Sequence, residues 1–133
     1  TIQAQYLALL NEIKKESDVA LLFITHDFGI VAKMCDQVAV MYAGKIVEMG
    51  GVRDIFNHPA HPYTEALLAS VPKMEEDVDR LYSIEGQPPT LHDLPPGCAF
   101  AARCPYVVER CREEYPPQFE ARENHISACW RLA

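Results

Sequence analysis

Apolar residues recur at helical spacing near the start of the chain and gather into a continuous run a little further on. The first pattern predicts an amphipathic helix, because five apolar residues fall on one face: Ile2, Tyr6, Leu9, Leu10 and Ile13. Lys14 and Lys15 follow in its last turn, where cations suit the negative end of the helix dipole. The run VALLFIT at residues 19–25 is apolar throughout, which is typical of a strand covered on both faces.

The next segments predict a short helix, a hairpin and two more short helices. Asp27 is placed to cap a helix that starts in HDFGIVAKMC, and QVAVMY and KIVEMG read as strands joined by a tight Ala43–Gly44 turn. In GVRDIFNHPAHPYTEALLASVP, Pro59 ends one helix and Pro62 starts the next. A helix, a buried strand, a helix and a hairpin indicate an α/β protein with an antiparallel edge.

The pattern changes near residue 72, so we divide the chain into residues 1–71 and 72–133. KMEEDVDR is a charged stretch that we expect to be solvated, and seven of the ten prolines lie between residues 88 and 117. A segment so rich in proline buries too little apolar surface to offset its loss of conformational entropy. The second part is therefore expected to be small and irregular and to need a covalent or metal staple.

Composition excludes some functional classes. The net charge is −7 and no basic stripe is present, which argues against nucleic acid or an anionic membrane as the main partner. No apolar run approaches the ~20 residues of a membrane-spanning helix, and the first residues do not resemble a signal peptide. Without an export signal a reducing compartment is expected, where a framework of disulfides is uncommon.

Four of the five cysteines lie in the second part and are the candidate staple. Their spacing is Cys98-x5-Cys104-x6-Cys111-x17-Cys129. Four thiolates can hold a tetrahedral zinc ion or an iron–sulfur cluster. The intervals are wider than those of most zinc knuckles, which favours a [4Fe–4S] cluster without deciding the matter. Buried free thiols or two adventitious disulfides are the alternatives.

The remaining cysteine and the histidines receive structural interpretations. Cys35 lies on the apolar side of a helix and is expected in a core. His125 is a possible zinc ligand, but we prefer to interpret it as an exposed side chain. His58 and His61 flank prolines and are expected to be structural, and His92 has no evident partner.

Several motifs together resemble a known family. The strand end Thr25-His26-Asp27 and the hairpin MYAGKIVEMG are similar to the end of an ABC-transporter ATPase domain. The segments HPAHPYTEALLASVP and PPGCAFAARCP, with the later cysteine and Cys129–Trp130, narrow the resemblance to ATP-binding subunits of oligopeptide, dipeptide and nickel importers. The resemblance covers essentially the whole chain, and it implies the C-terminal part of a P-loop ATPase domain with an incomplete sheet.

The resemblance also implies site residues and cofactors. His26 matches the switch histidine, which contacts the γ-phosphate of ATP and helps to position the attacking water. Cys98, Cys104, Cys111 and Cys129 match the ligands of a [4Fe–4S] cluster that some members carry, with zinc as the alternative. ATP and Mg²⁺ are then the cofactors of the intact protein.

The implied partners are those of an importer. They are a second ATPase subunit, membrane permease subunits and, through the permease, an extracytoplasmic solute-binding protein. The implied location is the cytoplasmic face of the membrane, as a peripheral subunit that couples ATP hydrolysis to solute uptake. Peptide, dipeptide and nickel all remain open as the solute.

The motifs for the rest of the ATPase chemistry are absent from this sequence. It contains no GxxxxGK[ST] loop, no strand ending in Asp-Glu and no LSGGQ-type signature. The start of the chain resembles the helix that follows the Asp-Glu strand, so we expect a truncated chain that is inactive alone and that self-associates through exposed apolar surface. A non-catalytic module stapled by a metal or cluster is the alternative function, and a redox enzyme is a weaker one.

Overall fold

The computed structural model describes residues 2–72 and 83–133, and it contains two compact units, residues 1–36 and 37–133. Each unit is described by itself. The charged stretch KMEEDVDR and the start of the second predicted domain lie outside the described residues, and the domain boundary near residue 72 stays a prediction.

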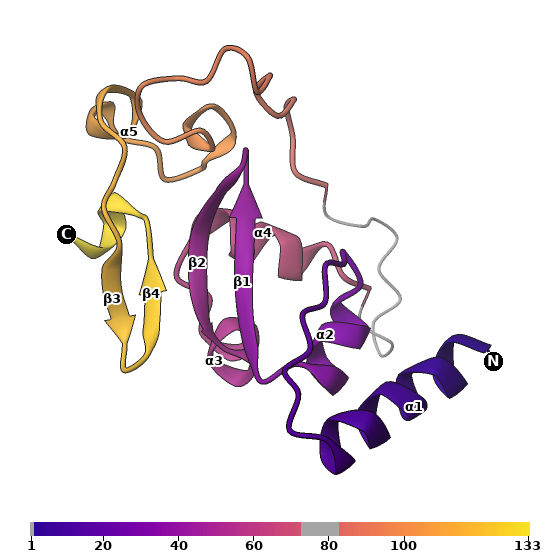
Figure 1. The fold of residues 1–133 in the computed structure, drawn as a ribbon. Helices are drawn as coiled ribbons and strands as arrows, with labels where there is room; N and C mark the ends of the chain where they lie inside the picture. Colours follow the sequence, from indigo (N-terminus) through magenta and orange to yellow (C-terminus); the bar gives the residue numbers. More distant parts are fainter. Residues whose placement is uncertain (1, 73–82) are drawn as a thin grey trace. The chain divides into compact units, whose positions relative to one another are not determined.

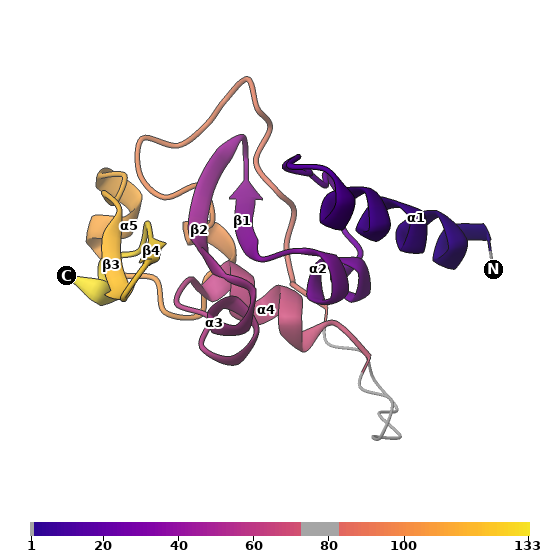
Figure 2. The same cartoon turned by 60° about the horizontal axis from the view of Figure 1, so that its bottom comes forward.

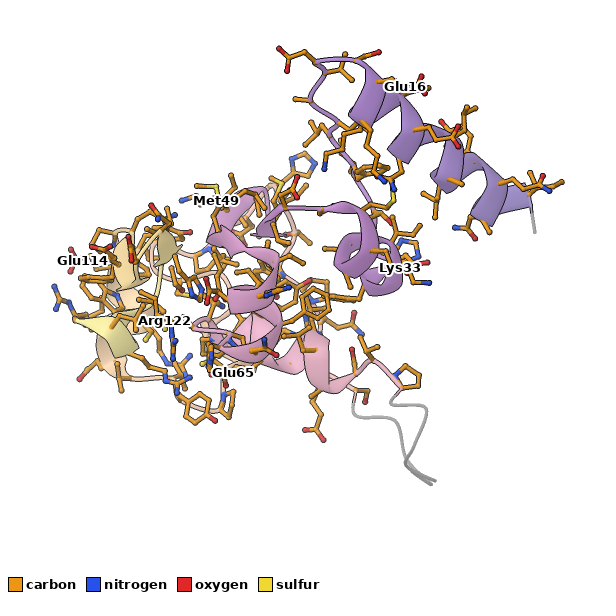
Figure 3. All side chains as sticks on the ribbon, turned by 90° about the horizontal axis from the view of Figure 1, so that it is seen from below. Glu16, Lys33, Met49, Glu65, Glu114 and Arg122 are labelled. Carbon is orange, nitrogen blue, oxygen red and sulfur yellow. The ribbon has the colours of Figure 1, made fainter. Side chains whose placement is uncertain are left out.

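The first unit contains two helices joined by an extended segment. Helix α1 spans Ile2–Glu16 and α2 spans Phe28–Met34, as the apolar spacing and the capping residue predicted. The Asp27 side chain caps α2 by accepting hydrogen bonds from the backbone N–H groups of Gly29 (2.8 Å) and Ile30 (3.2 Å). Lys14 Nζ lies 2.7 Å from Asp36 Oδ2. Figure 3 draws these side chains, with Glu16 labelled on α1 and Lys33 on α2.

The buried strand predicted at residues 19–25 is wrong for this chain. The segment has no regular secondary structure and pairs with no strand of the described residues, and Leu22 and Ile24 are 89% and 95% exposed. A central strand needs neighbouring strands on both sides to satisfy its backbone groups. The described residues of this chain supply none of them to residues 19–25.

The second unit is built on a four-stranded antiparallel sheet with strand order β1-β2-β4-β3 (Figure 1). Strands β1 (Gln37–Tyr42) and β2 (Lys45–Gly51) form the predicted hairpin. Its turn residues have positive φ, 49° at Ala43 and 78° at Gly44, which matches the twist of a tight hairpin. Strand β4 (His125–Ser127) pairs with β2, and β3 (Phe119–Arg122) pairs with β4.

Short helices complete the second unit (Figures 1 and 2). Helix α3 spans Val52–Asn57 and ends before Pro59, and α4 spans Pro62–Ala69 with Pro62 in its first turn, both as predicted. The later part contains η1 (Ala101–Arg103), α5 (Glu109–Glu113) and η2 (Trp130–Leu132). The segment from Ser83 to Phe100 forms neither helix nor strand, as expected for its prolines.

An aromatic core joins the hairpin to the cysteine-rich part. Val40, Tyr42, Val47, Ile55 and Phe100 form the buried cluster. Phe100 packs against Tyr42 edge to face, with 5.3 Å between ring centroids, and Tyr63 of α4 lies 4.6 Å from Tyr42. The side chain of Phe100 therefore anchors the segment that carries Cys98 and Cys104 to the sheet.

Candidate functional site

The four clustered cysteines meet at one cavity of the second unit. Cys98, Cys104, Cys111 and Cys129 all line a cavity of about 90 Å³, together with His61, Phe100, Tyr106, Trp130 and Arg131 among others. They come from four places: the segment before η1, the end of η1, helix α5 and the residue before η2. Sequence spacing alone did not show that these four segments converge.

Every pair among these four thiols interacts electrostatically. Cys111 and Cys129 both raise the pKa of Cys98, Cys98 and Cys111 raise that of Cys104, and Cys104 and Cys111 raise that of Cys129. The largest cause of each raised pKa is burial, which disfavours the charged thiolate. Burial and neighbouring thiols therefore favour the neutral thiol form of Cys98, Cys104 and Cys129.

An inorganic group bound by several thiols limits how far apart their sulfur atoms can lie. A single zinc ion bound by thiolates at ~2.3 Å requires sulfurs less than ~4 Å apart. No group of three or more His, Cys, Asp or Glu side chains within residues 2–72 and 83–133 is placed to hold a metal ion. Neither the predicted cluster nor the zinc alternative therefore has a preformed ligand set in the described residues. All four thiols nevertheless border one cavity, as the ligands of a multi-atom cluster must.

A close backbone approach holds two of the cysteine segments together. The backbone N–H of Cys98 donates a hydrogen bond to the carbonyl oxygen of Cys111, with a distance of 2.7 Å. A Cβ atom at Gly97 would lie only 2.2 Å from that same oxygen. Only glycine permits this approach, so Gly97 belongs to the construction of the thiol cavity.

A buried carboxylate connects the sheet to the cavity wall. Glu48 of β2 is fully buried, and its Oε1 accepts hydrogen bonds from the backbone N–H of Ala60 (2.7 Å) and from His125 Nε2–H (2.5 Å). Its Oε2 accepts from the backbone N–H of His61 (2.9 Å). Three donors thus compensate the burial of one charge, as a buried carboxylate requires.

The exposed position expected for His125 is wrong. The His125 side chain is fully buried in β4, against Gly50 and Glu48 of β2, and its Nδ1 has no hydrogen-bond partner among the described residues. A Cβ at Gly50 would lie 3.1 Å from the imidazole ring. Gly50 could have signalled this packing in the sequence, because a glycine inside a strand often marks close approach by another segment.

His61 has the structural role that was expected. It precedes α4, and its Nδ1 accepts the backbone N–H of Tyr63 at 3.0 Å. Burial lowers the pKa of His61 to about 4; Glu48 opposes this shift and Arg131 adds to it. The imidazole is therefore neutral near pH 7, as an acceptor for a helix cap must be.

The first unit presents His26 at an exposed turn. His26 lies between the extended segment and α2, and its neighbours are engaged locally: Thr25 Oγ1 accepts the backbone N–H of Asp27 at 3.0 Å, and Asp27 caps α2. The turn therefore holds its shape through Thr25 and Asp27 while the imidazole faces solvent. Cys35, expected in a core, is half-buried at the C-terminal cap of α2, where burial raises its pKa.

No helix within the described residues combines the length and the apolar character needed to cross a bilayer.

Comparison with known proteins gives consistent matches. Residues 47–111 match the family model described as the oligopeptide/dipeptide transporter, C-terminal region. The dipeptide transport ATP-binding protein DppD of Bacillus subtilis is 50% identical over 130 residues, which are 98% of this chain and 39% of that protein. The oligopeptide transport ATP-binding protein OppD of Escherichia coli is 44% identical over 131 residues, again 98% of this chain and 39% of the relative.

The resemblance noted in the sequence is confirmed by these matches. The chain spans about two-fifths of the length of the curated relatives that it matches. The family model covers most of strand β2, helices α3 and α4, and three of the four clustered cysteines. Residues 47–111 therefore match the C-terminal region of oligopeptide/dipeptide transporters, and nearly the whole chain is similar to the ATP-binding subunits of peptide importers.

Proposed function

We propose that the protein acts as an energising subunit of an ABC importer for peptides or related solutes, coupling ATP hydrolysis to uptake. The observation that carries this proposal is identity of 43–50% across nearly the whole chain to proteins named as dipeptide or oligopeptide transport ATP-binding proteins. It would work with a second ATPase subunit, with permease subunits and, through them, with an extracytoplasmic solute-binding protein. Its place is then peripheral, at the cytoplasmic face of the membrane.

Within this function His26 is proposed as the switch histidine. Its imidazole hydrogen-bonds a γ-phosphate oxygen and helps to position the attacking water. The support is local geometry: the imidazole is exposed at a turn whose other two polar side chains are already engaged. The phosphate-binding loop, the Asp-Glu strand and the signature segment do not occur in this sequence, so ATP and Mg²⁺ would be held largely by other residues.

Uptake and ATP hydrolysis test this role together. In the assembled importer, His26→Ala should lower kcat for ATP by ~10²–10³-fold, the usual loss for one stabilising donor, with a small effect on ATP binding. Uptake of a labelled dipeptide should fall in parallel. His92→Ala is the matched control, because His92 is also exposed but lies outside the turn. Unchanged hydrolysis in His26→Ala would remove the switch assignment.

The four clustered thiols are proposed to hold a [4Fe–4S] cluster through Cys98, Cys104, Cys111 and Cys129. Two observations support this: all four cysteines border one cavity, and neighbouring thiols help to raise the pKa values of Cys98, Cys104 and Cys129. When bound, the cluster would supply a rigid inorganic crosslink among four segments, with the capacity to gain or lose an electron. The protein's own part is to bring the segments together, through Phe100 and Gly97, and to exclude water with apolar walls.

Iron and sulfide analysis after anaerobic purification tests the cluster. The expected result is near four iron and four sulfide per chain, lost in Cys98→Ser and retained in the control Cys35→Ser. One stoichiometric zinc in place of iron would overturn the cluster in favour of zinc. A protein that takes up neither would overturn both.

The alternative drawn from the sequence, a non-catalytic interaction module stapled by a metal or cluster, is not supported by the comparisons. It would be favoured if the assembled protein bound its importer partners and its cluster but His26→Ala changed neither hydrolysis nor uptake.

A further inference from the structure

The thiol cavity contains one pair of cysteines whose backbones are in direct contact. The Cys98 N–H and the Cys111 carbonyl oxygen are 2.7 Å apart. Among the backbone hydrogen bonds of turns, loops and caps in the described residues, those of Cys104 and Cys129 involve no second cysteine. The pair Cys98–Cys111 is therefore distinguished from every other pair at the site by main-chain geometry.

This geometry suits a covalent bond between the two side chains. The hydrogen bond of 2.7 Å holds the backbones of Cys98 and Cys111 in direct contact. Disulfides form between residues whose Cα atoms are ~4.4–6.8 Å apart. Both cysteines also line the same cavity.

We propose that the four-thiol site has a second chemical state, in which Cys98 and Cys111 form a disulfide when the site is empty and hydrogen peroxide is present. One thiolate attacks a peroxide oxygen, becomes a sulfenic acid and releases water after proton transfer. The second sulfur then attacks the sulfenic sulfur, the S–S bond forms, and a second water leaves. Two thiols lose two electrons and two protons, and one peroxide is reduced to two waters.

The disulfide state controls whether the four-thiol site can bind an inorganic centre. A disulfide between Cys98 and Cys111 removes two of four ligands, so an inorganic centre cannot be bound until a dithiol reduces the bond. Once a sulfenic acid forms, its neighbour is already in place, so ring closure outruns further oxidation. This inference concerns the empty thiol site and does not depend on transport.

Peptide mapping tests the pairing directly. The full chain, freed of metal by a chelator and reduced, is treated anaerobically with one equivalent of hydrogen peroxide, alkylated and digested. The expected main product joins Cys98 to Cys111 and lacks two hydrogen masses. The same treatment in urea is the control for geometry, since an unfolded chain favours the shorter loops Cys98–Cys104 and Cys104–Cys111.

Variants make the pairing falsifiable. Cys98→Ser and Cys111→Ser should each abolish the product, while Cys35→Ser, whose cysteine lies in the other unit, should leave its yield unchanged. Gly97→Ala should lower the yield, because its Cβ pushes the two backbones apart. Circular dichroism shows which variants fold. A folded wild-type chain that gives mostly another pair, the same mixture as in urea, or no crosslink at all would overturn the proposal.

Reloading gives a second readout. The oxidised chain should take up little iron when supplied with iron and sulfide, and treatment with dithiothreitol should restore the uptake to the level of the reduced chain. Equal uptake by the oxidised and reduced chains would show that the disulfide does not control the site.

Discussion

At the scale of single residues, the Glu48 carboxylate links several segments of the second unit through hydrogen bonds. It is fully buried and serves three donors, from Ala60, His61 and His125. These donors lie on the loop before α4 and on β4, so one carboxylate ties three segments together. A charge buried in this way stabilises only while all its partners are present.

Replacing Glu48 by Gln is expected to destabilise the unit strongly. The Gln amide would present N–H groups to backbone N–H donors, and breaking a buried pair in this way costs ~3–5 kcal/mol. Urea unfolding followed by Trp130 fluorescence measures the loss. Glu65→Gln is the matched control: Glu65 pairs with Arg131 at the surface and should cost under ~1 kcal/mol. Equal effects of the two changes would contradict this account of Glu48.

His61 gives the protein a predictable response to acid. Its pKa is lowered from 6.5 to about 4 by burial, so the unfolded chain takes up a proton at higher pH than the folded chain. The stability linked to His61 is therefore complete above pH ~6.5 and is lost as the pH falls toward 4, to the extent of ~3 kcal/mol.

The variant His61→Asn isolates this contribution. The Asn side-chain oxygen can accept the Tyr63 N–H as the imidazole does, but it does not titrate. Unfolding free energies measured from pH 7.5 to 4 should fall less steeply in His61→Asn than in the wild type. His92→Asn, at an exposed position, should follow the wild type. Parallel curves for wild type and His61→Asn would show that folding does not lower the pKa of His61.

At the scale of elements, the hairpin β3–β4 depends on its turn. Asn124 has φ 57°, in the left-handed region that Asn tolerates better than most residues. Asn124→Ala should therefore cost ~1 kcal/mol, and Asn124→Gly should cost little. The neighbouring exposed Glu123→Ala is the control and should stay within ~0.5 kcal/mol. Urea midpoints measure all three, and a neutral Asn124→Ala would contradict the strained turn.

The elements also show how far sequence reasoning reaches. Helix α1, the cap at Asp27, the hairpin turn and the start of α4 at Pro62 were predicted, because each depends on local periodicity or on one residue's backbone preference. Strands β3 and β4 were missed, since they contain few residues and depend on pairing with β2, far away in the sequence. The strand at residues 19–25 failed for the opposite reason: its pattern is right, but its partners are not in the described residues.

The candidate site, too, could be predicted from the sequence only in part. The cysteines were found by residue type and spacing, which is enough to nominate ligands. Their convergence needed Gly97 against Cys111 and Phe100 in the aromatic core, and these contacts join residues that no periodic pattern links. Glu48 and His125 are 77 residues apart in the chain, so their pairing was invisible in the sequence.

At the scale of the whole molecule, the first unit leaves much apolar surface uncovered. Ile2, Tyr6, Leu9 and Ile13 of α1 are all at least 41% exposed, and Leu22 and Ile24 are almost fully exposed. Apolar groups in such number on one short segment are typical of an interface, and an extended segment without strand partners adds unpaired backbone groups. The chain is therefore expected to associate with copies of itself when no other polypeptide covers this surface.

Sedimentation velocity of the isolated chain over a range of concentrations measures this association. The weight-average coefficient should rise with concentration, and the double variant Leu9→Glu/Ile24→Glu should remain monomeric, because two charges in the apolar surface must be desolvated on contact. Leu91→Glu is the control, since Leu91 is equally apolar and 68% exposed but belongs to the second unit. The first unit would not mediate association if Leu91→Glu also abolished it, or if the wild type sedimented as a monomer at every concentration. Loss of association in the double variant alone would locate it on α1 and the extended segment, the elements whose predicted strand partners the described residues lack.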